Sequence, residues 1–163
     1  MHKVVQNSFE NAFYSGKGSM VLLREFIIGD IGRVYEIESR SFKDPYHPVF
    51  LLNLYETYPR TFLVALENEM VVGYVISRTI NAAGHIIAIA VDPIKRRREI
   101  GKTLMVETMK RLRGCGVNNI WLEVRKSNID AIEFYRKLGF VKGGIVRGYY
   151  SDSEDAIILR RLI

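Results

Sequence analysis

The segment Ile86-Ile-Ala-Ile-Ala-Val-Asp-Pro-Ile-Lys-Arg-Arg-Arg-Glu-Ile-Gly-Lys-Thr-Leu104 decides the fold class of this chain of 163 residues. From His85 to Val91, apolar residues occupy both alternating sets of positions, which predicts a strand with both faces covered. Residues 92–98 contain a proline and a run of basic residues and predict a loop. Apolar residues then recur at helical spacing from residue 100 to residue 112, and glycines at 114 and 116 predict the end of this helix.

Another strand is predicted directly after this helix, over residues 119–124. Strand, helix and strand within about 40 residues predict a right-handed parallel crossover. The rest of the chain predicts strands over residues 21–25, 61–66, 70–80, 140–149 and 156–162, and helices from residue 31, over residues 49–57 and over residues 128–138. We therefore expect an α+β fold, an α/β sandwich, with one mixed, mainly antiparallel sheet, a central parallel strand pair and helices on both faces.

Length and composition predict one domain, because 48% of the residues are hydrophobic and 26% are charged, as in globular proteins. Residues 1–19 show no sustained period and end in Ser-Gly-Lys-Gly-Ser, which predicts a flexible N-terminal extension before a single domain over residues 20–163. The chain has one cysteine, and no apolar run approaches the roughly 18 residues of a membrane span. We expect a cytoplasmic protein with no membrane partner and no metal site.

The positive charge belongs to the C-terminal half. Residues 1–94 contain 8 Lys+Arg and 10 Asp+Glu, a net charge of −2, whereas residues 95–163 contain 16 and 8, a net charge of +8. Such asymmetry indicates a polyanionic partner, either a nucleic acid or a small molecule that carries phosphate.

The basic residues 95–98 lie just before a predicted helix. A helix N-terminus carries unpaired N–H groups and a partial positive charge, so clustered cations there destabilise the helix unless an anion binds. A strand, short loop and helix start are also where phosphates bind in sheet proteins. An anion site is therefore one interpretation, and a solvated basic surface or a nucleic-acid patch are the alternatives.

The quoted segment resembles the acetyl-CoA motif of the GNAT N-acetyltransferases, in which an apolar strand is followed by Arg or Gln-x-x-Gly-x-Gly or Ala at a helix start. Arg96, Glu99 and Gly101 occupy the three marked positions. Two later segments, Leu122-Glu-Val-Arg-Lys-Ser-Asn128 and Ala131-Ile-Glu-Phe-Tyr-Arg-Lys-Leu-Gly-Phe140, resemble the second motif of the family. The resemblance runs from about residue 21 to the C-terminus and is closest to the archaeal and RimI-like protein N-α-acetyltransferases.

The resemblance implies acetyl-CoA as cofactor. It implies a cofactor site made of Ile89, Ala90, Val91, Arg96, Arg97, Arg98, Glu99, Ile100, Gly101, Lys102, Thr103, Asn128 and Tyr135, with Asn128 also a helix cap. Glu99 departs from the motif, because the family places a glycine there. Its carboxylate would lie near a pyrophosphate, so we expect it to point away from the ligand.

Three residues match catalytic positions of the family. Tyr135 matches a tyrosine that acts as general acid near the cofactor sulfur, although its helical spacing also suits a core aromatic residue. His85 and Glu123, on the two predicted parallel strands, match a pair of basic groups in protein N-terminal acetyltransferases. A strand histidine with a structural role is the alternative, and Trp121 and Cys115 are expected to contribute to packing.

The C-terminal segment Gly148-Tyr-Tyr-Ser-Asp-Ser-Glu-Asp-Ala156 resembles a hairpin of the protein N-terminal acetyltransferases. The resemblance implies that Tyr149 and Tyr150 bind the substrate backbone, whereas a role in capping the sheet is the alternative. The resemblance also implies that a loop with Phe42, Lys43, Asp44 and Tyr46 forms the other wall of the peptide-binding cleft and contacts the substrate.

We therefore expect an acyltransferase that moves acetyl directly from acetyl-CoA to a protein N-terminal amine in a ternary complex, with ribosomal or nascent chains among its substrates. One alternative is a GNAT enzyme that acetylates a small-molecule amine or a lysine. A nucleic-acid-binding protein that uses residues 95–98 is the remote alternative.

Overall fold

The computed structural model describes residues 11–15 and 18–163. Its strands are β1 (Asn11–Tyr14), β2 (Met20–Glu25), β3 (Phe62–Glu67), β4 (Met70–Ile80), β5 (Ala83–Val91), β6 (Asn119–Arg125), β7 (Val141–Val146) and β8 (Ala156–Leu162). Its α-helices are α1 (Ile31–Ser41), α2 (Pro48–Thr57), α3 (Ile100–Gly114) and α4 (Ile129–Lys137). Single 3-10 turns precede α1, β3 and α3.

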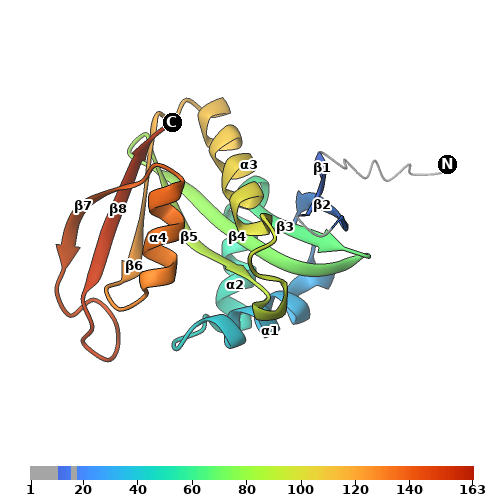
Figure 1. The fold of residues 1–163 in the computed structure, drawn as a ribbon, viewed down its shortest axis with the longest axis horizontal. Coiled ribbons are helices and arrows are strands. Elements are labelled where there is room, and N and C mark those ends of the chain that lie inside the picture. Colours follow the sequence, from blue (N-terminus) through green and yellow to red (C-terminus); the bar gives the residue numbers. More distant parts are fainter. Residues whose placement is uncertain (1–10, 16–17) are drawn as a thin grey trace.

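The described strands form one sheet in the order β1-β2-β3-β4-β5-β6-β8-β7. Neighbouring strands are antiparallel except β5 and β6, which are parallel. Helices α1 and α2 cover one face of the sheet, and α3 and α4 cover the other (Figure 1). The predicted α+β fold, with its central parallel pair, is confirmed.

Both sheet faces carry a core, because successive side chains of a strand point to opposite faces. In β4, Tyr74 packs with Ile37 of α1 in one core, and Val75 packs with Leu104 of α3 in the other. All four side chains are fully buried. Burial of each aliphatic side chain contributes roughly 1.5 to 3 kcal/mol.

The parallel pair separates soon after it begins. The two strands are paired at Gly84 with Ile120 and at His85 with Trp121, yet β5 continues to Val91 and β6 continues to residue 125. Gly84 permits the close start, because a Cβ there would lie 2.7 Å from the Ile120 side chain. Beyond His85 the edge of β5 is therefore open in the sense that it has no strand partner in β6. Figure 1 shows the two strands diverging.

Two sequence predictions are wrong at the sheet edges. The N-terminal extension was expected to lack structure, but Asn11–Tyr14 forms β1 and pairs with β2. A four-residue edge strand is too short to produce a periodic signal, and residues 1–10 and 16–17 lie outside the described part. The strand predicted over residues 140–149 is shorter, because the chain turns at Gly148, whose φ is 59° and whose N–H donates to Asp155 Oδ1 at 3.0 Å.

Candidate active site

A buried carboxylate holds the start of the loop between β5 and α3. Asp92 is fully buried, and its Oδ1 accepts a hydrogen bond from the Ile94 N–H at 3.2 Å. Its Oδ2 accepts a hydrogen bond from Arg33 of α1, and Arg40 lies 3.4 Å away. Burial acts to raise the pKa of Asp92, but the Ile94 N–H and Arg33 outweigh burial and hold the pKa below its ordinary value. The loop is therefore fixed to α1 by an ion pair.

Two of the four basic residues in this loop pair with an acidic side chain of the protein. Lys95 donates a hydrogen bond to the buried carboxylate of Glu67 in β3, and Arg98 lies 3.7 Å from the other oxygen of that carboxylate. The hydrogen bond from Lys95 lowers the pKa of Glu67. Glu67 therefore offsets part of the positive charge that a bound anion was expected to neutralise, so the charge of this loop alone does not require an anion.

The two middle residues of the basic run are exposed. Arg96 donates from Nε to the Val91 carbonyl and from Nη2 to Ser41 Oγ, each at 3.2 Å. Arg97 has a left-handed backbone with φ of 61°, and its side chain makes no hydrogen bond or ion pair with another described residue. Arg97 is therefore the cation of this loop that is free to bind an external anion.

Glu99 is the N-cap of α3 and has a left-handed backbone, with φ of 66° and ψ of 0°. This conformation costs a non-glycine residue about 1 to 2 kcal/mol, which is a physical reason for a glycine at this position of the motif. The Glu99 carboxylate is exposed and pairs with Lys102 at 3.0 Å. Sequence reasoning considered only the charge of Glu99 near a pyrophosphate and missed this backbone conformation.

The first turn of α3 offers N–H groups that the helix itself does not use. The first bond within the helix runs from the Thr103 N–H to the Glu99 carbonyl at 2.9 Å. Ile100 is buried in the core and anchors the turn. A Cβ at Gly101 would lie 3.3 Å from Phe134, so the glycine allows α3 to approach α4 closely. The arrangement is suited to bind an anionic group.

Ile89, Ala90 and Val91 lie on the part of β5 that has separated from β6. Ile89 and Val91 pack toward α3 and α4, and Ala90 packs on the opposite face. Their side chains belong to the two cores, so these residues can offer a ligand only their backbone groups.

Helix α4 contributes two of the predicted residues. Asn128 caps the helix by accepting a hydrogen bond from the Ala131 N–H at 3.1 Å, as predicted. Tyr135 is buried between two phenylalanine rings, and its hydroxyl makes no hydrogen bond with another described residue. Burial and the neighbouring Tyr150 raise the pKa of Tyr135, so the hydroxyl keeps its proton at neutral pH.

The structure brings His85 and Glu123 into contact where β5 and β6 separate. His85 Nε2 lies 2.8 Å from Glu123 Oε2, and the buried imidazole stacks on Trp121 with ring centroids 3.9 Å apart. The Tyr149 hydroxyl donates to Glu123 Oε1 at 3.3 Å. Burial and Glu123 raise the pKa of Tyr149 to about 12, so its hydroxyl is a donor at neutral pH.

The loop between α1 and α2 forms one wall beside this cluster. Glu38 of α1 is buried, accepts a hydrogen bond from the Tyr46 N–H at 2.9 Å and accepts another from the Tyr74 hydroxyl. Burial raises the pKa of Glu38 to about 7, against the effect of the Tyr46 N–H. Burial, with Glu38 and Glu123, also raises the pKa of Tyr46. Phe42, at the start of the loop, is partly exposed.

The loop between β7 and β8 forms the opposite wall. The rings of Tyr149 and Tyr150 meet edge to face at 5.0 Å, and the Arg125 guanidinium lies 4.0 Å above the Tyr150 ring. Burial raises the pKa of Tyr150. Tyr149 of this loop thus contacts the Glu123 carboxylate, and Tyr150 packs against Tyr149.

Lys43 and Asp44 connect the two walls. Lys43 Nζ lies 2.7 Å from Asp152 Oδ2, while Asp44 Oδ2 lies 2.8 Å from both Arg125 Nη2 and Ser151 Oγ. The sequence predicted both as substrate-binding residues, but their charged groups contact the facing loop. Sequence reasoning missed Arg125, which joins the loops at the end of β6.

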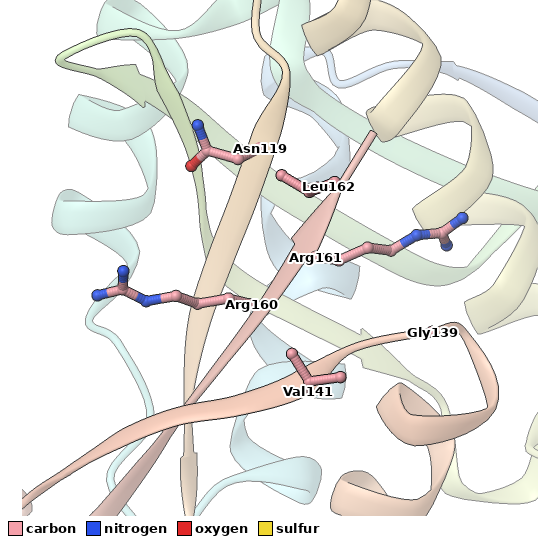
Figure 2. A pocket seen from close by; sticks show the side chains of 6 residues that line it. All are labelled: Asn119, Gly139, Val141, Arg160, Arg161 and Leu162. Carbon is pink, nitrogen blue, oxygen red and sulfur yellow. The ribbon is translucent and has the colours of Figure 1, made fainter.

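Other features of the described residues lie apart from the His85–Glu123 contact and the two loops beside it. Figure 2 shows a surface hollow lined by Asn119, Gly139, Val141, Arg160, Arg161 and Leu162, none of which is a predicted site residue. Cys115 is exposed at the C-cap of α3, so its predicted packing role is wrong, whereas Trp121 does pack, on His85. Within the described ranges, no three His, Cys, Asp or Glu side chains are arranged to hold a metal ion, and no helix has the length and hydropathy of a membrane span.

Comparison with known proteins agrees with this geometry. The chain is 33% identical over 158 residues to an N-alpha-acetyltransferase of Saccharolobus solfataricus, covering 89% of this chain and 95% of that protein. It is 34% identical over 134 residues to the [Ribosomal protein bS18]-alanine N-acetyltransferase of Escherichia coli strain K12, covering 80% and 89%. The crystal structure of Ard1 from Thermoplasma volcanium superposes with a TM-score of 0.85 at 33% identity, covering 88% of this chain and 97% of that one.

Residues 31–140 match the Acetyltransferase (GNAT) family. This range includes the loop before α3, the open edge of β5 and both motif segments identified in the sequence. The chain is therefore an acetyltransferase and belongs to the GNAT family.

Proposed function

We propose that this enzyme transfers acetyl from acetyl-CoA directly to the α-amine of a protein N-terminus. The observation that carries the proposal is the position of the His85–Glu123 contact. It lies where β5 and β6 separate, between two loops that both present tyrosines. A carboxylate and an imidazole beside an opening of this kind suit the removal of a proton from an incoming amine.

The residues of the α3 loop fit acetyl-CoA. The free N–H groups of the first turn of α3 and the unpartnered Arg97 are the donors that a pyrophosphate needs. The open edge of β5, with backbone groups at residues 89–91, suits the amide-bearing arm of the cofactor. Acetyl-CoA supplies an acetyl group activated as a thioester. We assign to Tyr135 of α4, whose hydroxyl keeps its proton at neutral pH, the donation of a proton to the leaving sulfur.

The thiol of Cys115 lies at the far end of α3 from the arginine loop, and it is the only cysteine of the chain. A covalent enzyme thioester at this cleft is therefore not expected, which supports direct transfer within a ternary complex. The α-amine also suits a modest base. Because its pKa is about 7.7 to 8.0, neutralising it at pH 7 costs about 1 kcal/mol, against about 4.6 kcal/mol for a lysine.

Two named relatives support a protein N-terminus as substrate, since one is an N-alpha-acetyltransferase and the other acetylates an alanine of ribosomal protein bS18. We extend this substrate class to the present chain, with ribosomal or nascent chains as candidates. Acetylation of a small amine or a lysine is the second candidate. The nucleic-acid interpretation is weakened, because Glu67 already pairs with Lys95 and Arg98.

A mass-spectrometric assay separates the candidates. The enzyme is incubated with acetyl-CoA and a panel of peptides with free N-termini, the same peptides with blocked N-termini and an internal lysine, and spermidine. We expect acetyl on the α-amine of free peptides. Acetyl only on lysine or spermidine would contradict the proposal, and salt-sensitive binding of DNA unaffected by acetyl-CoA would favour the nucleic-acid alternative.

The variants His85→Ala and Glu123→Ala test the cluster itself. We expect each to reduce kcat by about tenfold and the double variant to be at least as impaired as Glu123→Ala, with activity remaining in all three because water can still accept the proton of a weakly basic amine. Full activity in the double variant would remove both residues from the mechanism.

A further inference from the structure

Three neighbouring strands place one row of side chains on the same face of the sheet. Arg78 of β4 is paired with His85 of β5, and His85 is paired with Trp121 of β6. Directly opposite residues share a face, and Glu123, two positions beyond Trp121, lies on that face as well. The family resemblance did not single out Arg78, because only the strand register brings it to the cluster.

The hydrogen bonds of this row determine where the imidazole proton lies. Arg78 Nε donates to His85 Nδ1 at 3.2 Å. A guanidinium N–H can only donate, so Nδ1 must offer its lone pair. The single proton of the neutral ring is then on Nε2, and it is donated to Glu123 Oε2 at 2.8 Å.

In this arrangement both nitrogens of His85 are engaged, and neither has a lone pair left for a substrate proton. Glu123 is an acceptor only, and its Oε1 receives just the longer bond from Tyr149 at 3.3 Å. The titratable and charged groups around Glu123 are His85 of β5, Arg78 of β4, Tyr46 of the α1–α2 loop, and Tyr149 and Tyr150 of the β7–β8 loop.

We infer that Arg78 is a positioning residue of this site: by fixing the tautomer of His85, it makes His85 a donor to Glu123 and leaves the Glu123 carboxylate as the acceptor for the proton of the substrate amine. The inference rests on the proposed function, since it needs an amine substrate. One proton passes from the ammonium nitrogen to a Glu123 oxygen, directly or through one water, and the N–H bonding pair becomes the lone pair of the neutral amine. Glu123 then releases the proton to solvent.

The tautomer is measurable without substrate. The chain has only three histidines, so long-range 1H–15N correlation spectra of the protein labelled with 15N-histidine contain few imidazole signals. The signals of His85 are identified as those that disappear in His85→Gln. We expect His85 to be neutral with its proton on Nε2. In Arg78→Met, which removes the donor, we expect the Nδ1 signal to shift toward a mixture of tautomers, and in Arg78→Lys, which keeps a donor, we expect it to stay close to the wild type. Arg113→Met, at an exposed position in the last turn of α3, is the control.

Kinetics test the roles separately. Glutamine can place an N–H where His85 Nε2 lies, so His85→Gln is expected to keep kcat within about threefold, while His85→Ala and Arg78→Met lower kcat about tenfold with little change in peptide KM. Glu123→Gln is expected to lose about tenfold at pH 7, where roughly a tenth of the amine is neutral, and to approach the wild type at pH 9.

Several results would overturn the inference. They are a charged or Nδ1-protonated His85 in the wild type, a kcat for Arg78→Met equal to that of Arg113→Met, and a His85→Gln variant as impaired as His85→Ala. If no peptide is acetylated, the proposed function fails, but the spectra still decide whether Arg78 sets the tautomer.

Discussion

Arg125 Nη2 lies 2.8 Å from Asp44 Oδ2 and so joins the end of β6 to the loop between α1 and α2. The same guanidinium lies 3.0 Å from Asp152 and 2.8 Å from Glu154 in the loop between β7 and β8. Desolvation acts to lower the pKa of Arg125, but these carboxylates outweigh it and raise the pKa. One side chain therefore joins the loop between α1 and α2 to the loop between β7 and β8.

We expect Arg125→Met to raise the peptide KM by about threefold and to leave kcat nearly unchanged, because the walls lose their connection while the Glu123 cluster remains. Ion pairs at the surface contribute little energy each and weaken in salt, so the wild-type KM is also expected to rise with ionic strength. Steady-state kinetics at low and high salt measure both effects. A kcat defect without a KM change would show that Arg125 acts on chemistry instead.

Glu99→Gly is expected to stabilise the protein by about 0.5 to 1 kcal/mol. The substitution removes the steric cost of the left-handed backbone at the N-cap of α3, and this gain exceeds the loss from the greater conformational entropy of glycine in the unfolded chain. It is also expected to tighten the binding of CoA by removing a carboxylate near the phosphate site. Thermal unfolding and calorimetry give the two quantities.

Glu99→Gln separates these two effects, because it removes the charge and keeps the left-handed residue. It should bind CoA more tightly than the wild type without gaining stability. Unchanged or weaker CoA affinity in Glu99→Gly would contradict the assignment of this loop as the phosphate site.

Glu38→Gln tests the buried carboxylate behind Tyr46. The pKa of Glu38 is about 7 in the folded protein against 4.5 for an ordinary glutamate. Between these values the unfolded chain has lost the proton and the folded chain retains it, so the free energy of unfolding falls as pH rises from about 4.5 to 7, by roughly 3 kcal/mol. Urea unfolding at pH 5 and pH 7.5 measures this loss.

We expect Glu38→Gln to remove most of that pH dependence, because glutamine resembles the protonated acid. Glu36→Gln, at an exposed position on the same helix, should keep it. An unchanged pH dependence in Glu38→Gln would show that Glu38 is ionised in the folded protein.

Asp92→Asn is expected to destabilise the protein by about 3 kcal/mol, because it leaves Arg33 without its buried partner. The pKa of Asp92 is below its ordinary value, so the stability it contributes is present above pH 4 or so and is lost as pH falls further. Urea unfolding at neutral pH checks the loss. A stable Asp92→Asn protein would mean that the loop before α3 is held by other contacts.

Sequence reasoning located the chemistry by linear motifs and missed what depends on strand register or on distant contacts. The pairing of His85 with Glu123 was predictable, because both lie on strands joined by one crossover helix. The contact of Arg78 with His85 depends on a hairpin register that contains a bulge, which no local pattern specifies. The pairing of Lys95 with Glu67 joins residues far apart in the sequence and could not be inferred from charge alone.

Backbone conformation was the other source of error. Glu99 is a good helix former by composition, yet it occupies a left-handed N-cap. The assignment of Lys43 and Asp44 to substrate binding had a different cause. The sequence does not reveal that the loop between β7 and β8 lies opposite these residues and binds their charged groups.

A crystal structure with CoA joined covalently to the α-nitrogen of a peptide tests the central claim most directly. We predict phosphates at the first turn of α3 beside Arg97, and the joined nitrogen within hydrogen-bond reach of Glu123, directly or through one water. A conjugate bound outside the opening between β5 and β6, or a nitrogen remote from Glu123, would contradict the account.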